Sequence, residues 1–154
     1  MRPIKFRAWD TIRKVMFSAE EMGADQEALL PDGRGFANIS STNTRLTQIH
    51  SHLLPLQYTG LKDKQGKEIY EGDFLKYTRF GWRCLGHPKH DTDLVTHYEV
   101  RWNDEYHAFS VENKSMSGCL TFNDSRARKN EIEVIGNIYE NKELLETERI
   151  EEEA

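Results

Sequence analysis

Apolar and polar residues alternate with a period of two along much of the chain, which is the pattern of β-strands with one buried face. Residues 4–9 alternate in this way and predict a strand that buries Phe6 and turns Lys5 and Arg7 towards water. Residues 15–17 follow a short turn and predict its return strand. The first predicted element is therefore a β-hairpin.

The strongest pattern lies at residues 57–77, with the sequence QYTGLKDKQGKEIYEGDFLKY. It predicts two short strands joined by a tight turn and followed by a third strand. Asp63 and Gly66 occupy the first and fourth positions of the turn. An aspartate at the first position accepts hydrogen bonds from nearby backbone N–H groups, and a glycine at the fourth adopts a positive φ at little cost. This stretch predicts strands and a turn, and it carries no catalytic, cofactor or metal motif.

A second hairpin is predicted over residues 98–111. Tyr98, Val100 and Trp102 alternate with polar residues, so all three are expected on the buried face of a strand. A turn follows at residues 103–105, and the alternation then resumes. Truncation of Trp102 should therefore unfold the chain or weaken it badly.

The other segments give weaker signals. Residues 132–138 predict a last strand. Ser18 and Glu21 match a capping box, but Gly23 favours a single helical turn at that point. Residues 79–95 show no periodicity and predict a surface loop between strands.

These elements predict a mainly β fold, that is, a β-rich α+β chain with an antiparallel sheet or small barrel, hairpins and a short C-terminal helix. Asn141 is the expected N-cap of that helix. Residues 1–154 are expected to form a single domain. The alternative is an N-terminal β subdomain at about 1–56 and a barrel-like subdomain at about 57–145. Within the latter, residues 68–111 could supply most of a barrel of the Src-homology-3 type.

Composition favours a folded protein of the cytoplasm. The chain has 37% hydrophobic and 31% charged residues and a formal net charge of −5, with the acidic excess concentrated near the C-terminus. A near-neutral body argues against strong nonspecific binding to nucleic acid. No apolar segment is long enough for a signal peptide or a membrane span. Cys84 and Cys119 are too few for a disulfide framework and are expected to be thiols.

The best candidate for a metal site is the group Cys84, His87, His90 and Asp91, with Asp93 and His97 just beyond, because thiolate, imidazole and carboxylate are zinc-ligand types. Structural zinc sites usually draw their ligands from two separated pairs, whereas these residues lie in one predicted loop. The sequence therefore favours a solvated polar loop and no metal. His50 and His52 lie two positions apart, and an exposed polar face is the favoured interpretation.

No residue is assigned a catalytic role, and no cofactor is expected. Glu68, Glu71 and Asp73 resemble a group of carboxylates for acid–base chemistry, but two of them border a turn and no apolar pocket is predicted around them. All three are expected to be solvated or to stabilise the turn. The apolar neighbours of Cys119 favour a buried, inert thiol.

Nucleic-acid binding has one weak set of candidates on the first hairpin, which are Arg2, Lys5, Arg7 and Trp9. Cations for phosphates and flat rings for bases are what single-stranded nucleic acid requires. The strand pattern counts against this interpretation, because it turns only Trp9 to the same face as the basic residues.

Three separated motifs, RPIKFRAWD, TGLKDKQGKEIYEGD and EVIGNIYENKELL, resemble the YopX family of bacteriophage and prophage proteins in sequence and order. The resemblance implies a small, mostly β, phage-encoded protein that acts inside the bacterial host cell. It brings no catalytic residues to this chain. The leading hypothesis is a non-enzymatic module that binds a host or phage protein. A nucleic-acid-binding module is the alternative, a metal-dependent hydrolase is a third, and no membrane partner is expected. The sequence does not determine the oligomeric state.

Overall fold

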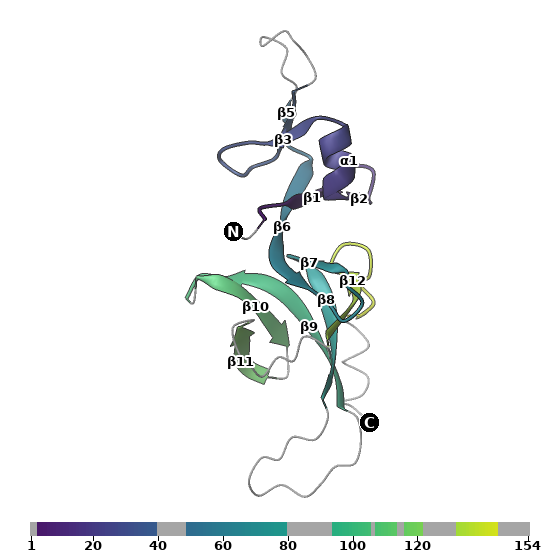
Figure 1. Ribbon diagram of the computed structural model, residues 1–154, viewed down its shortest axis with the longest axis vertical. Coiled ribbons are helices and arrows are strands. Elements are labelled where there is room, and N and C mark those ends of the chain that lie inside the picture. Colours follow the sequence, from purple (N-terminus) through teal and green to yellow (C-terminus); the bar gives the residue numbers. More distant parts are fainter. Residues whose placement is uncertain are drawn as a thin grey trace, which may run out of the picture. The chain divides into compact units, whose positions relative to one another are not determined.

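The chain divides into two compact units in a computed structural model (Figure 1). Unit 1 comprises residues 1–60 and 139–154, and unit 2 comprises residues 61–138. Both are built from antiparallel strands, which confirms the predicted mainly β class. The structure describes residues 3–39, 49–79, 94–105, 107–113, 116–121 and 132–144.

Unit 1 contains the predicted first hairpin, formed by β1 (Phe6–Asp10) and β2 (Val15–Phe17). The long strand β6 (Leu53–Lys62) pairs with the other edge of β1, so β1 is the central strand. β6 continues into unit 2, where β7 (Glu68–Tyr70) is its neighbour in the sheet.

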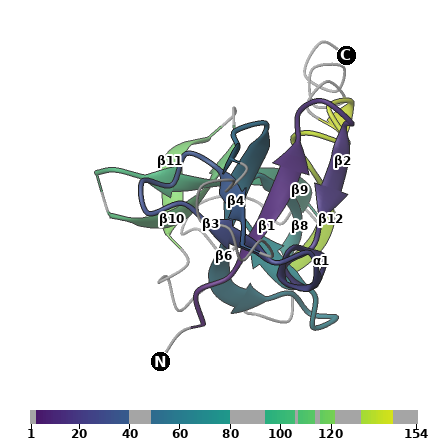
Figure 2. The same cartoon turned by 90° about the horizontal axis from the view of Figure 1, so that it is seen from above.

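A second small sheet in unit 1 consists of β3 (Glu27–Leu29), β4 (Phe36–Asn38) and β5 (Ile49–His50). The helix α1 (Ala19–Ala24) lies beside β1 and β3 (Figure 2). Its capping box is complete, because Ser18 Oγ accepts from Glu21 N–H and the Glu21 carboxylate accepts from Ser18 N–H. The helix spans six residues and is longer than the expected single turn, because the complete capping box stabilises its start and Gly23 does not end it.

The central strand β1 is buried on both faces, which corrects the prediction that Arg7 faces water. Arg7, Ala8 and Trp9 are all buried. Ala8 joins a core with residues that include Met22, and Trp9 stacks on Tyr139 at a ring-centroid distance of 5.2 Å. A one-sided alternation pattern cannot reveal a second covering layer that comes from a distant part of the sequence.

Unit 2 is a five-stranded antiparallel sheet in the order β11-β10-β9-β8-β12, which curls into a half-barrel. Its core consists of Ile69, Leu75, Val100, Phe109, Ile132 and Val134. The strands are β8 (Asp73–Arg79), β9 (Leu94–Asn103), β10 (Ala108–Asn113), β11 (Met116–Thr121) and β12 (Ile132–Asn137). The two predicted hairpins and the last strand are confirmed, whereas sequence patterns missed β11.

Trp102 is not a core residue, and the prediction that it is buried is wrong. It is 44% exposed, whereas its cross-strand neighbour Phe109 is 6% exposed. The two rings meet edge to face with centroids 5.3 Å apart. The pair lies at the end of the β9–β10 hairpin, where Trp102 covers Phe109 and its own outer side remains in solvent.

Two predictions fall largely beyond the described residues. The predicted loop 79–95 overlaps β8 and β9 at its two ends, where Arg79 pairs with Leu94, and residues 80–93 lie outside the described part of the chain. The expected C-terminal helix also lies mostly outside it and is not confirmed. Residues 141–144 form a turn in which Leu144 N–H donates to the Asn141 carbonyl.

The turn between β6 and β7 has the predicted geometry and generates a first test. Gly66 has φ 86° and donates its N–H to the Asp63 carbonyl at 3.0 Å. A Cβ there would meet nothing within 4 Å, so only the backbone conformation resists a side chain. We expect Gly66→Val to lower the free energy of unfolding by about 1–2 kcal/mol in denaturant titrations, because left-handed backbone is unfavourable for a β-branched residue.

The matched control is Gly23→Ala, at a helical glycine with equal room for a methyl group. This change should stabilise the chain by roughly 0.5–1 kcal/mol. Equal effects of the two substitutions would show that the turn conformation does not determine the cost at Gly66.

Candidate functional site

Three buried aspartates lie at strand ends in the motif regions of the chain, namely Asp10, Asp63 and Asp73. Each side chain accepts hydrogen bonds from backbone N–H groups of the adjoining turn. Such bonds satisfy donors that would otherwise be buried without acceptors, so all three side chains support local structure.

Asp10 fixes the turn between β1 and β2. Its Oδ1 accepts from the N–H groups of Ile12 and Arg13, both at 2.8 Å. The Arg13 N–H bond is the main reason that the pKa of Asp10 lies below its ordinary value, although burial acts in the opposite direction. Thr11 adds two further bonds, since its N–H and its hydroxyl both donate to the His52 carbonyl at 3.0 Å. The turn is therefore held rigidly.

Asp63 joins the β6–β7 turn to β12 within unit 2. Its Oδ1 accepts from Gln65 N–H and Lys67 N–H, and its Oδ2 accepts from Val134 N–H at 3.1 Å. Burial alone would raise the pKa of Asp63, but these backbone donors, led by Val134, outweigh burial and hold the pKa below its ordinary value. The ionised carboxylate is the form that the fold requires.

Asp73 stabilises the turn before β8, as the sequence predicted. Its Oδ2 accepts from Tyr70 N–H at 2.8 Å. Gly72, with φ 79°, donates to the Val100 carbonyl at 2.8 Å and accepts from Ile138 N–H. Nearby, Tyr70 donates its hydroxyl to Glu68. These contacts assign Asp73 to the turn and pair the Glu68 carboxylate with the Tyr70 hydroxyl.

A group of acidic and imidazole side chains joins three segments of unit 1. Glu27 Oε2 lies 3.0 Å from His50 Nδ1, and Glu27 Oε1 accepts from Asn38. The rings of His50 and His52 are 5.5 Å apart, and His52 Nε2 lies 4.0 Å from Asp10 Oδ2. The expected exposed polar face is wrong for His50, whose side chain is only 19% exposed. The carboxylates of Glu27 and Asp10 also accept other hydrogen bonds, so this group links the three segments structurally.

The metal candidates Cys84, His87 and His90 lie outside the described residues, and their arrangement stays a prediction. Among the residues that the structure does describe, no three ligand side chains gather in a way that could hold a metal ion. Cys119 lies in β11, and its side chain is outside the described set.

The nucleic-acid candidates do not assemble an exposed basic and aromatic surface among the described residues. Arg7 and Trp9 are buried. Lys5 lies 3.7 Å from the Glu20 carboxylate and also approaches the Tyr58 ring at 5.9 Å. Arg2 lies outside the described part of the chain.

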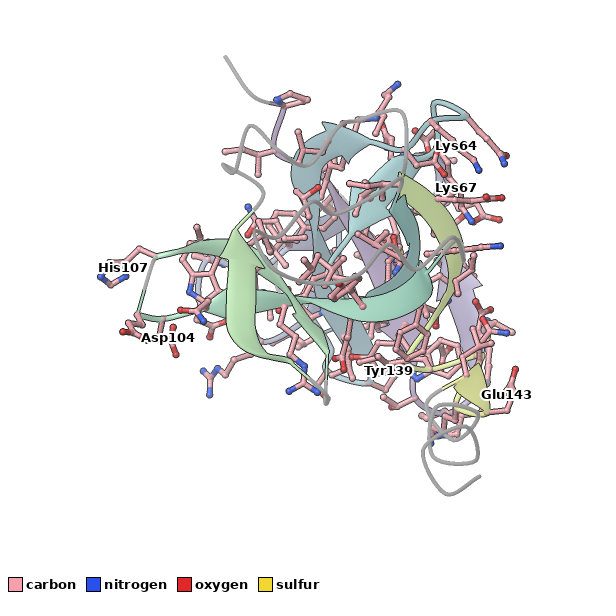
Figure 3. All side chains as sticks on the ribbon, turned by 90° about the horizontal axis from the view of Figure 1, so that it is seen from below. Lys64, Lys67, Asp104, His107, Tyr139 and Glu143 are labelled. Carbon is pink, nitrogen blue, oxygen red and sulfur yellow. The ribbon has the colours of Figure 1, made fainter. Side chains whose placement is uncertain are left out.

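The end of the β9–β10 hairpin is the candidate functional surface of unit 2. We define this hairpin end as Trp102, Asp104, Glu105, His107 and Phe109. Figure 3 shows Asp104 and His107 at the outer end of the hairpin with their side chains directed away from the sheet. Asp104, Glu105 and His107 are exposed, and the Asn103 side chain accepts from Glu105 N–H at 3.0 Å, which shapes the turn.

Sequence reasoning missed this surface because the alternation continues unbroken through Trp102. The available signal was its position immediately before the turn Asn103-Asp104-Glu105, where a strand reaches the limit of the core. At such a position, a large aromatic residue can cover a buried neighbour and still face water.

The chain is a mainly β protein in which the buried aspartates Asp10, Asp63 and Asp73 shape the turns. The chain belongs to the YopX family, because the model of that family, described as YopX protein, matches residues 5–146. Within the described residues, no helix has the length and apolar character that crossing a membrane requires.

The chain is also similar to a solved structure, the crystal structure of protein EF1440 from Enterococcus faecalis. The two sequences are 29% identical, and the match covers 94% of this chain and 99% of that one with a TM-score of 0.59. No curated protein matches the chain.

The three bonds of Asp63 lead to a test that depends on pH. In Asp63→Asn an amide NH₂ group replaces one of the two carboxylate oxygens, so at least one backbone N–H faces another donor and loses its acceptor. We therefore expect the free energy of unfolding to fall by about 1–3 kcal/mol at neutral pH. Because the folded pKa lies below the ordinary value of 3.8, the stabilisation by the wild-type carboxylate is complete above that value. It is lost as the pH falls through the folded pKa, so the difference between the proteins should shrink below about pH 4.

Asp104→Asn is the matched control, since it removes the same charge from an exposed turn of the same unit. It should change the free energy of unfolding by less than about 0.5 kcal/mol. A difference between Asp63→Asn and wild type that stays constant down to about pH 2 would contradict the assigned role of the carboxylate.

Proposed function

We propose that this YopX-family chain is a phage- or prophage-encoded accessory protein that acts in the cytoplasm of the bacterial host. It is a non-enzymatic module, and it binds a host or phage protein through the hairpin end of unit 2. The observation that carries this proposal is the exposure of Trp102 on a folded β-hairpin.

Trp102 has the properties of an anchor in a protein interface. Tryptophan is enriched among the few interface residues that contribute most of the binding free energy. The edge-to-face contact with Phe109 at 5.3 Å orders the ring before a partner arrives. Ordering in advance reduces the entropy that is lost on binding, so more of the contact energy is available as affinity.

The charges near Trp102 indicate the chemistry of the partner surface. Asp104 and Glu105 are exposed on the same turn. Arg101 is the nearest described cation in sequence, and Glu99 accepts two hydrogen bonds from it at 2.7 and 2.8 Å. A partner with an apolar pocket and basic residues at its rim would complement this end.

The assigned roles of the acidic residues count against catalysis among the described residues. Asp63 and Asp73 accept backbone hydrogen bonds, and Glu68 accepts from Tyr70. General acid–base catalysis requires a carboxyl group that can reach a substrate proton. These carboxylates are directed to the fold itself, which favours binding over chemistry.

Trp102→Ala tests the proposal by affinity capture from infected or lysogenic cells, after nuclease treatment. We expect the wild-type chain to retain a defined host or phage protein and Trp102→Ala to retain at least tenfold less, which corresponds to about 1.4 kcal/mol. Trp102→Phe should keep part of the binding. Thermal unfolding should show that Trp102→Ala costs about 1–2 kcal/mol and remains folded, because the ring is only partly buried.

Ile39→Ala is the matched control, since Ile39 is another exposed apolar side chain, 62% exposed, in unit 1. It should retain the partner fully. Equal recovery by Trp102→Ala and wild type would contradict the assignment of the binding surface to the hairpin end. Recovery that is abolished by nuclease treatment would contradict the proposal and favour the nucleic-acid alternative.

A further inference from the structure

The turn between β1 and β2 presents one aliphatic and two basic side chains to solvent. Ile12 is 72% exposed, and the Arg13 side chain is 74% exposed. Lys14 and Val15 are exposed beside them. A single exposed apolar residue is ordinary on a protein surface, so the distinguishing feature of this turn is that Ile12 and Val15 stand beside two exposed cations.

Five hydrogen bonds hold this turn in a single conformation. Asp10 Oδ1 accepts from Ile12 N–H and Arg13 N–H, and the Asp10 carbonyl accepts from Lys14 N–H at 2.9 Å. The two bonds from Thr11 to the His52 carbonyl tie the turn to the start of β6. Lys14 has φ 59°, an unfavourable backbone conformation for a side-chain-bearing residue, which the bond to Asp10 helps to maintain.

The charge that this turn presents outwards is positive. Asp10 is buried, and its carboxylate accepts hydrogen bonds from two backbone N–H groups of the turn itself. Arg13 Nε lies 3.8 Å from Asp10 Oδ2 but leaves most of its side chain in solvent. The carboxylates of the neighbouring α1 are directed elsewhere, since Glu21 accepts from Ser18 and Glu20 lies 3.7 Å from Lys5.

We propose that the β1–β2 turn is a second contact surface of the chain, and that it binds an acidic protein segment. Ile12 and Val15 contact apolar side chains of that segment, and Arg13 and Lys14 meet its carboxylates. A rigid turn loses little conformational entropy on binding, and complementary charge guides the encounter and fixes its orientation. This surface lies in unit 1 and is independent of Trp102.

An acidic protein segment fits this turn better than nucleic acid does. The turn has two cations and no aromatic ring, whereas binding to single strands relies on base stacking as well as on several phosphate contacts.

The test is a titration of the full chain, followed by amide NMR, with a synthetic peptide of alternating Glu and Leu. Matched probes are a Lys and Leu peptide of equal length and a DNA duplex. We expect the acidic peptide to shift the resonances of residues 12–15 saturably and to bind more weakly as salt rises. Lys14→Glu should weaken binding about 3- to 10-fold, and Ile12→Ser should weaken it by a similar factor.

Lys142→Glu is the matched control, because it makes the same charge change at an exposed residue of unit 1 outside the turn. It and Trp102→Ala should bind the peptide as the wild-type chain does. The proposal is overturned if the acidic peptide leaves residues 12–15 unshifted, if the basic peptide binds equally well or if only the duplex binds. It is also overturned if the shifts depend on protein concentration alone, which would indicate contact between copies of this chain.

Discussion

The rest of this structure depends on hydrogen bonds that buried carboxylates accept from backbone N–H groups. A chain of short strands must turn often, and each turn leaves N–H groups that no sheet ladder satisfies. Asp10, Asp63 and Asp73 accept these donors at three strand ends. Asp63 also links two elements, because it bonds both to its own turn and to Val134 in β12. A charged acceptor makes such bonds stronger than a neutral one would, and its loss would leave buried donors unsatisfied.

Local sequence predicted much of this fold because strands and tight turns have local signatures. The residue types and spacing of Asp63 and Gly66 predicted their turn, and the structure confirms it. Sequence could not predict the burial of Arg7 and Trp9, because Trp9 stacks on Tyr139 from the far end of the chain. It also misjudged Trp102, since alternation identifies the face of a strand but not where along the strand the core ends.

The exposed apolar residues Ile12 and Trp102 are both held by hydrogen-bonded turns. In unit 1 the buried Asp10 holds a turn that presents Ile12 beside basic residues. In unit 2 the β9–β10 hairpin presents Trp102 beside Asp104 and Glu105. In both cases the backbone is already ordered, so a partner that binds the exposed side chain causes little further loss of conformational entropy. The two surfaces differ in charge and would therefore select different partners.

Photocrosslinking from position 102 in lysogenic or infected cells tests the central claim most directly. A photoreactive phenylalanine analogue at this position would join the chain to whatever contacts the hairpin end, and the same analogue at Lys142 serves as the control. We expect a crosslink from position 102 to one defined host or phage protein, and no such crosslink from position 142. Crosslinks to nucleic acid alone, or the same products from both positions, would contradict it.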